Sequence, residues 1–293
     1  MGLGEALSLG SAAAWAVGVI LYRRLGDVLP PLPLNFLKNL VVLALLVPTV
    51  VIAHGWLPPS MSTLDIALAV GSGFIGIAVA DTLYLRALNE LGAGRMGIVG
   101  NAYSPLVIVL GVLLLGERLN AWQMLGFALV TVGVLLVAKP PSRWKTEPEH
   151  SVRGALLGLL SVLLMAVAII MVKRVLEQQP LFWVTLVRMI GAVLGMLLIA
   201  SLRGELRRLV PKRPLPWRQL VTAALVGQYL AMLLWLGGYK YTDASVAAIL
   251  NETSSAFIVL LAWLWLKERP TRRNLIGVTL ALGGVFFMLH AGG

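Results

Sequence analysis

Long apolar runs separated by short polar breaks follow one another along the whole chain. A membrane-spanning helix needs about 20 mostly apolar residues. Runs of about that length cover residues 4–22, 33–53, 64–88, 93–115, 119–138, 152–172, 180–202, 216–239, 244–266 and 273–290. Backbone groups in lipid must bond to one another, and the strands of a membrane barrel would alternate in polarity over about ten residues, which these runs do not. The pattern therefore predicts ten transmembrane helices.

The longest polar break, at 139–152, lies near the midpoint of the chain and holds three prolines and several charges. It separates two halves that resemble each other. We therefore predict a first five-helix repeat at residues 1–138, a polar linker at 139–151 and a second five-helix repeat at 152–293.

The two halves are related by a nearly constant shift in residue number. Adding 151 carries more than fifty residues of the first half onto the second without a gap, and near the start of each half the shift is 150. The matched pairs include Ser11 and Ser161, Lys38 and Arg188, Ser104 and Ser255, Glu117 and Glu268, and Gly133 and Gly284. Spaced glycines and a repeated Glu-Arg pair are not explained by apolar composition, so the duplication is real.

An odd number of helices in each half makes the second half enter the membrane from the opposite side. Inverted repeats are typical of secondary transporters, whose solute site lies between the repeats near the bilayer midplane. The predicted fold is an all-α integral membrane protein with ten transmembrane helices, arranged as two inverted five-helix repeats around a central cavity.

Composition agrees with this reading, and charge adds an orientation. Apolar residues make up 59% of the chain and charged residues 13%, against about 25% charged in soluble domains. The net charge of +11 does not indicate a nucleic-acid partner, because the basic residues lie in the short breaks. Breaks after odd-numbered helices hold about eighteen Lys and Arg, and the others hold about four. The positive-inside rule then predicts that both termini lie on the extracytoplasmic side of the inner (plasma) membrane.

Specific residues recur at the ends of the predicted helices in both halves. The first half has Tyr84-Leu-Arg-Ala-Leu, Ser104-Pro105-Leu106 and Gly116-Glu117-Arg118, and the second has Ala244-Ser-Val-Ala-Ala-Ile and Lys267-Glu268-Arg269. These stretches resemble the EamA-type domain of the drug/metabolite transporter superfamily, and the resemblance covers nearly the whole chain. It implies ten helices, an inverted duplication, a central cavity and transport of metabolites, often export of amino acids or related compounds.

Four ionisable side chains stand out within the predicted spans: Lys38, Asp81, Arg188 and Glu252. Each costs about 2.5–3.5 kcal/mol or more at the bilayer centre, so such groups usually face an interior or a cavity. Glu252 is the leading candidate, because its repeat partner is Asn101 and both lie in polar patches. It either binds a substrate ammonium, takes up the coupling proton, or holds helices together through a hydrogen bond or ion pair.

The other three charges favour structural roles. Asp81, one helical turn before Tyr84, is expected to pair with Lys38 or Arg188. Lys38 and Arg188 lie near helix starts, where long cations reach toward the interface, and the family often carries an Arg at these places. The departure of Asn251-Glu252-Thr253 from the small or apolar residues of the family is specific to the second half.

Aromatic and small polar side chains at helical spacing complete a candidate binding set. Aromatic walls around a carboxylate suit a cationic or quaternary ammonium solute, although packing explains Trp15 and Trp235 equally well. The substrate-binding candidates are Glu252, Asn101, Trp15, Tyr103, Asp81, Tyr84, Gln228, Trp235 and Ser255.

The sequence has no P-loop, HExxH or GxSxG signature, its three histidines are scattered, and it has no cysteine. We therefore expect no enzyme, no cofactor and no metal site. The predicted function is secondary active transport by alternating access of an amino acid or amine-type solute, with export preferred over uptake. The alternatives are a passive facilitator for a small cationic solute and a membrane-embedded lipid-handling enzyme. The Gly-rich helices at 119–138 and 273–290 are expected to serve packing or contact with a second copy in a homodimer.

Overall fold

The computed structural model describes residues 2–91, 96, 99–138, 148–211, 214–257, 261 and 272–290, and within these ranges all regular secondary structure is helical. The helices are α1 (Leu3–Gly26), α2 (Pro31–His54), α3 (Thr63–Gly73), η1 (Phe74–Ala80), α4 (Asp81–Leu91), α6 (Tyr103–Leu110), η2 (Gly111–Leu115), α7 (Ala121–Ala138), α8 (Pro148–Gln178), α9 (Leu181–Leu202), η3 (Leu206–Arg208), α10 (Trp217–Ala224), η4 (Leu225–Leu230), α11 (Ala231–Tyr241), α12 (Ala244–Glu252) and α14 (Arg272–His290).

Within the described ranges, six helices or stacked helix segments are long and apolar enough to cross a membrane. They are Leu3–Gly26, Pro31–His54, Thr63–Leu91, Val152–Gln178, Leu181–Leu202 and Trp217–Tyr241, and three shorter apolar helices accompany them. The all-helical membrane architecture is therefore confirmed, and the exact number of ten spans stays a prediction.

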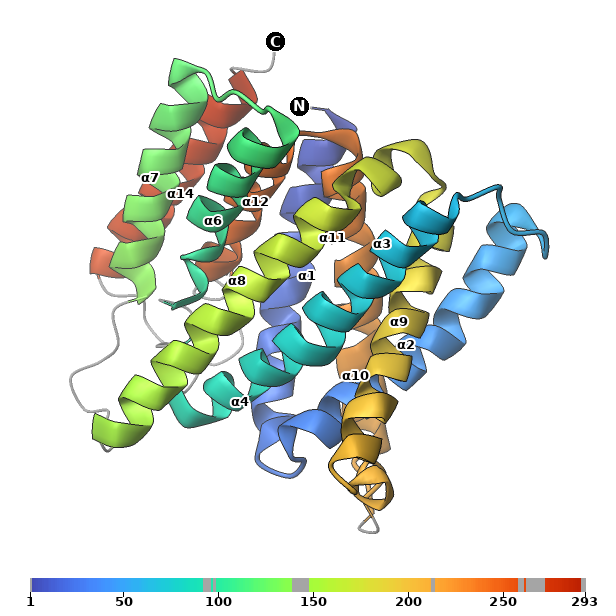
Figure 1. The fold of residues 1–293 in the computed structure, drawn as a ribbon. Helices are drawn as coiled ribbons and strands as arrows, with labels where there is room; N and C mark the ends of the chain where they lie inside the picture. Colours follow the sequence, from blue (N-terminus) through green and yellow to red (C-terminus); the bar gives the residue numbers. More distant parts are fainter. Residues whose placement is uncertain are drawn as a thin grey trace.

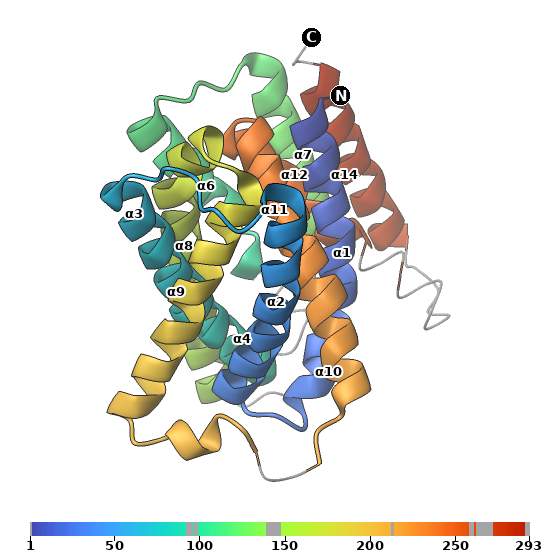
Figure 2. The same cartoon turned by 90° about the vertical axis from the view of Figure 1, so that its right-hand side faces the viewer.

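The helices form one bundle with both chain ends near the same end of it (Figure 1). The colour order in Figures 1 and 2 shows that α1 runs away from that end, whereas α8, the first helix of the second half, runs toward it. Between α7 and α14 the backbones touch at glycines: a Cβ on Gly133 would lie 2.5 Å from the carbonyl oxygen of Gly277, and one on Gly284 would lie 2.6 Å from that of Gly126. The two Gly-rich helices thus pack on each other.

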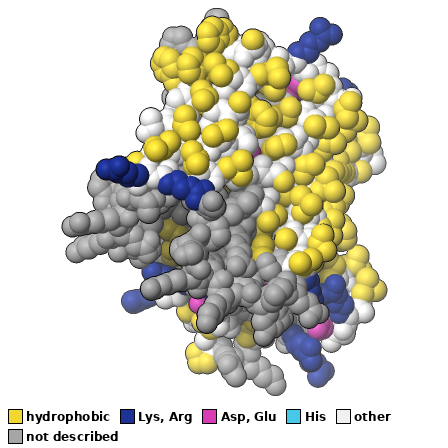
Figure 3. Space-filling model, turned by 90° about the vertical axis from the view of Figure 1, so that its left-hand side faces the viewer, with side chains coloured by type: hydrophobic (Ala, Val, Ile, Leu, Met, Phe, Trp, Pro, Cys, Tyr) yellow, Lys and Arg dark blue, Asp and Glu magenta, His cyan; other side chains and the backbone are white. Residues whose placement is uncertain are grey.

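Large apolar side chains also cover the outside of the bundle. Hydrophobic residues spread over the upper part of the face in Figure 3. Exposed examples on α7 and α14 are Trp122, Val132, Leu275, Leu282 and Phe286. A soluble protein rarely exposes so large an apolar surface, whereas a lipid-facing one must.

The two spans expected to be continuous at 93–115 and 244–266 are interrupted, and this is a difference from the sequence expectation. Asn101 and Ala102 form a turn before α6, and Thr253 forms a turn after α12. Pro105 explains the first break, because it lacks the N–H that would bond to the carbonyl of residue 101. At the second break, the Thr253 hydroxyl donates to the carbonyl oxygen of Leu250 at 2.6 Å, a local bond that competes with helix.

A second pair of helix irregularities lies at corresponding positions of the two halves. The segment η1 (Phe74–Ala80) and the segment η4 (Leu225–Leu230) are both π-helical, and a shift of 151 carries one onto the other. Such wide turns inside α-helices occur frequently at functional sites. Each π segment lies within one continuous helical span: η1 joins α3 to α4, and η4 joins α10 to α11.

Two expectations about helix ends are refined. The helix α8 begins at Pro148, inside the stretch predicted as a linker at 139–151, and residues 139–147 lie outside the described ranges, as do Glu268 and Arg269. The bounds of the linker and of the two repeats stay a prediction. Glu117 does more than end its own helix. Its carboxylate accepts from the backbone N–H of Ala244 at 2.7 Å and of Ser245 at 2.9 Å, so it stabilises the N-terminus of α12 in the other half.

Candidate functional site

A cavity of about 220 Å³ lies inside the bundle and is lined by α1, η1, α4, α8, α9, η4, α11, α12 and the two helix breaks. All nine substrate-binding candidates from the sequence line it: Trp15, Asp81, Tyr84, Asn101, Tyr103, Gln228, Trp235, Glu252 and Ser255. The structure therefore brings the whole set together, although their part in binding stays a prediction. The π segments contribute Gly76 and Gly227 to the lining, where the missing side chains let other helices approach: a Cβ would lie 2.8 Å from Ala168 and 2.5 Å from Gly18 respectively.

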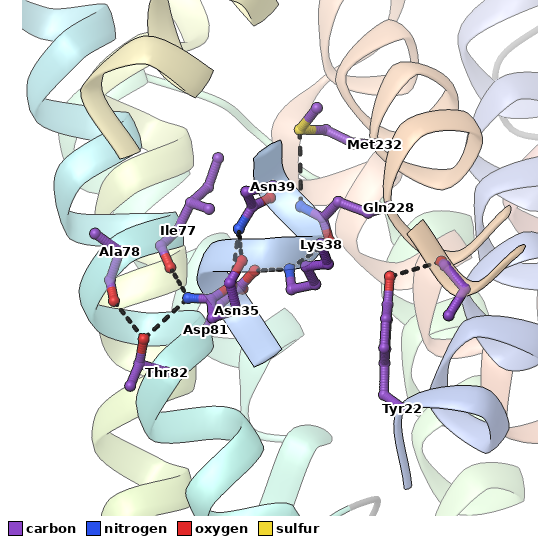
Figure 4. A network of polar contacts seen from close by, with 11 residues as sticks. Tyr22, Asn35, Lys38, Asn39, Ile77, Ala78, Asp81, Thr82, Gln228 and Met232 are labelled. Atoms are coloured by element: carbon purple, nitrogen blue, oxygen red, sulfur yellow. Dashed lines mark hydrogen bonds and ion pairs between the residues drawn. The ribbon is translucent and has the colours of Figure 1, made fainter. Parts of the chain in front are cut away.

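One side of the cavity carries a closed ion-pair network. The ammonium of Lys38 lies 2.8 Å from a carboxylate oxygen of Asp81 and donates to the amide oxygen of Gln228, also at 2.8 Å. Figure 4 shows these groups meeting between α2, α4 and η4. The expected pairing of Asp81 with Lys38 is thus confirmed, and its charge is compensated inside the protein.

An asparagine holds the neighbouring π segment. The side-chain amide of Asn35 donates to the carbonyl oxygen of Ile77 at 2.7 Å and to the hydroxyl of Thr82 at 2.9 Å (Figure 4). Buried backbone groups must find partners, and Asn35 supplies one within η1. The network therefore fixes the position of Asp81 directly after the π segment.

Glu252 is placed differently, at the end of α12 where the helix breaks. Its side chain is buried, and neither carboxylate oxygen has a hydrogen-bond partner among the described residues. Ser104 lies beside it, and its hydroxyl also lacks a partner in that part of the chain. The amide nitrogen of Asn101 is in the same state. Ser104 of α6 nevertheless faces the Glu252 carboxylate with its hydroxyl and its backbone N–H, so the interhelical contact expected as the structural alternative for Glu252 stays a prediction.

Aromatic rings line two sides of the cavity. Trp15 packs against Tyr84 with ring centroids 5.8 Å apart, and Trp235 meets Tyr239 edge-on at 5.1 Å. Tyr84 and Trp235 are repeat partners at a shift of 151. The hydroxyls of Tyr103 and Tyr239 lie 2.8 Å apart. Four of these rings, Trp15, Tyr84, Tyr103 and Trp235, line the cavity, and the hydroxyl of Tyr103 is hydrogen-bonded to that of Tyr239.

Arg188 was not among the substrate-binding candidates from the sequence. It was expected to be structural, yet it lines the cavity, is 2% exposed, and has no partner for Nε or Nη1 among the described residues. Its guanidinium carbon lies 5.7 Å from the centre of the Trp235 ring. The signal for its free state was available in the repeat: the position that corresponds to Asp81 is Met232.

Comparison with known proteins decides the family. The model of the EamA-like transporter family matches twice, at residues 2–139 and 152–290. The chain belongs to the EamA-like transporter family. Among relatives of this EamA-family member, an uncharacterized transporter named YetK of Bacillus subtilis is 24% identical over 78% of this chain and 69% of its own length. An uncharacterized transporter of Archaeoglobus fulgidus is 22% identical over 97% and 96%.

A solved structure, described only as the crystal structure of a protein, has the same fold. It superimposes with a TM-score of 0.78 at 17% identity and covers 98% of this chain and 96% of its own. The family match and the names of its relatives make this EamA-family protein a multi-pass membrane transporter rather than an enzyme. The resemblance found in the sequence is thereby confirmed.

Proposed function

We propose that this EamA-family transporter is a secondary carrier that moves a small amino acid or amine-type solute out of the cell by alternating access. The observation that carries the proposal is Glu252, a buried carboxylate that makes no ion pair with any described residue, in an aromatic-walled cavity. The sequence of the chain has no nucleotide-binding signature, so active transport would depend on an ion gradient.

Size supports a small solute. Pockets for drug-sized ligands measure about 300–1,000 Å³, and this cavity measures about 220 Å³. The faces of Trp15 and Trp235 would attract a cation through their π electrons. A solute of amino-acid size with an ammonium group fits both the volume and the walls.

Charge supports exchange with a proton. A carboxylate buried without a counter-charge is costly, so Glu252 is stable only when it carries a proton or faces a cation. The two cannot occupy the same oxygen together. One site that holds either the proton or the solute couples the inward flow of one to the outward flow of the other.

Helix irregularities support movement around the cavity. Discontinuous helices form the solute site in many transporters, and here both breaks, at Asn101 and Thr253, border the cavity. The opposed directions of α1 and α8 suit two inverted halves that rock about the site (Figure 1). Location in the plasma membrane, termini outside, and pairing with a second copy belong to the same proposal.

The test is solute counterflow in proteoliposomes with Glu252→Gln. We expect the variant to lose at least ten-fold in flux and to lose the pH dependence of the wild type, because glutamine can neither release a proton nor attract an ammonium. Glu205→Gln, outside the spans, is the matched control and should keep both. A Glu252→Gln variant with the flux and the pH dependence of the wild type would contradict the role of this carboxylate. Absence of trans-acceleration in the wild type would indicate a passive facilitator.

A further inference from the structure

The two halves give their matched cations unlike partners. In the first half, Lys38 of α2 pairs with Asp81 of α4 at 2.8 Å. The repeat shifts carry this pair onto Arg188 of α9 and Met232 of α11. Where the first half has a carboxylate, the second has a thioether, which cannot neutralise a charge.

No carboxylate in the described part of the chain forms an ion pair with Arg188, although Asp81 and Tyr103 act on it electrostatically. Nε and Nη1 of Arg188 have no hydrogen-bond partner there. Asp81 forms its ion pair, through Oδ2, with Lys38. The nearby hydroxyl of Tyr103 is bonded to Tyr239 at 2.8 Å. The ring of Trp235, 5.7 Å away, contributes a cation–π contact without any negative charge.

A guanidinium cannot escape this situation by losing its proton, because arginine stays charged in proteins. A buried charge needs a counter-charge or a hydrogen-bonding partner. Arg188 lines the same cavity as Glu252, so the missing partner can reach it from the cavity. The guanidinium fork matches the two oxygens of a carboxylate.

We propose that Arg188 binds a carboxylate of the transported solute. The inference rests on the proposed function of the cavity and deepens it: with Glu252 at a cationic group and Arg188 at an anionic one, the solute is a zwitterion. The cavity then holds one uncompensated charge of each sign, and a zwitterion neutralises both at once. An amine without a carboxylate would leave Arg188 unpaired.

Matched pairs of probes test this in the purified protein. Each pair consists of an amino acid and the amine that lacks its carboxylate, such as phenylalanine with phenethylamine and leucine with isoamylamine. A ligand that binds the folded state raises the melting temperature. We expect at least one amino acid to bind about ten- to hundred-fold more tightly than its amine, as a charged bidentate contact would provide.

Three variants separate the carboxylate contact from general damage. Arg188→Gln should abolish the preference for the amino acid, and Arg188→Lys should retain part of it, because lysine keeps the charge without the fork. Met232→Asp restores the acid of the first half and should abolish the preference while Arg188 is intact. This third variant keeps the proposal testable if Arg188→Gln does not fold, and gel filtration checks all three.

Several results would overturn the proposal: no amino acid stabilising the wild type, equal stabilisation by both members of every pair, or a preference that survives Arg188→Gln and Met232→Asp. A higher melting temperature in chloride than in gluconate, with no preference within the pairs, would assign the subsite to an inorganic anion. That result would also overturn the proposal. Counterflow by the wild type distinguishes the failures. Equal counterflow of both members refutes the carboxylate subsite, whereas no counterflow of any member refutes the transport proposal itself.

Discussion

At the scale of single residues, the cavity contains one charge pair that is closed and two charges that are open. Lys38 and Asp81 satisfy each other at 2.8 Å, with side-chain exposures of 2% and 12%. Arg188 and Glu252 have no hydrogen-bond partner for the atoms noted above within the described residues. A closed pair mainly fixes helices, whereas an open charge is available to a solute. We therefore propose that the first pair contributes to stability and that the other two residues bind the solute.

Removing one member of the closed pair should therefore affect stability first. Asp81→Asn leaves the Lys38 ammonium buried without its counter-charge, which typically costs about 3–5 kcal/mol. We expect a clearly lower melting temperature in detergent. The double variant Lys38→Met with Asp81→Leu should recover most of the loss, because replacing a buried ion pair with apolar residues is often neutral. A double variant no more stable than Asp81→Asn would contradict this view of the pair.

At the scale of helices, close contacts between glycines set where the two halves touch. A Cβ on Gly18 of α1 would lie 2.5 Å from the Cα of Gly227 in η4. The contact joins the first half to the π segment of the second, directly beside the cavity. Helices that approach this closely in membranes rely on small residues, so this crossing holds the cavity wall in place.

A methyl group at this crossing should push α1 and η4 apart. We expect Gly18→Ala to lower stability by about 1–3 kcal/mol through overpacking. Gly10→Ala on the same helix is the matched control, since its Cβ would lie 3.5 Å from the nearest atom, in Leu234. The control should be neutral or gain up to about 1 kcal/mol from helix propensity. Equal melting temperatures for the two variants would show that the crossing has room to spare.

The helices themselves were largely predictable, and their irregularities were not. Apolar run length located the spans, because lipid demands about 20 apolar residues of any helix. A run such as 216–239 looks the same whether its backbone bonds from i to i+4 or i to i+5, so η4 left no trace in the pattern. The break at Asn101 had a signal in Pro105, which lacks a backbone N–H. The break at Thr253 had none.

The site was predictable as a set of residues but not as a set of partners. Polar and aromatic side chains within apolar spans stand out, and all nine candidates line the cavity. Pairing depends on which helices meet, and a single sequence does not contain that information directly. Arg188 was therefore grouped with Lys38 as a structural cation, although the replacement of the corresponding acid by Met232 indicated its free state.

At the scale of the whole molecule, orientation decides what inward and outward mean for transport, and the chain offers a direct way to measure it. It contains no cysteine, so single cysteines can be introduced without background. Ser62 directly precedes α3, and Arg207 lies in η3, which follows α9; the start of α3 and the end of α9 lie at opposite ends of the bundle (Figures 1 and 2). The excess of Lys and Arg near Arg207 predicts that this end is cytoplasmic. In intact cells, a membrane-impermeant maleimide should label Ser62→Cys at once, and Arg207→Cys only after permeabilisation. The reverse pattern would invert the topology and with it the proposed sense of export, while leaving the cavity and its two open charges unchanged.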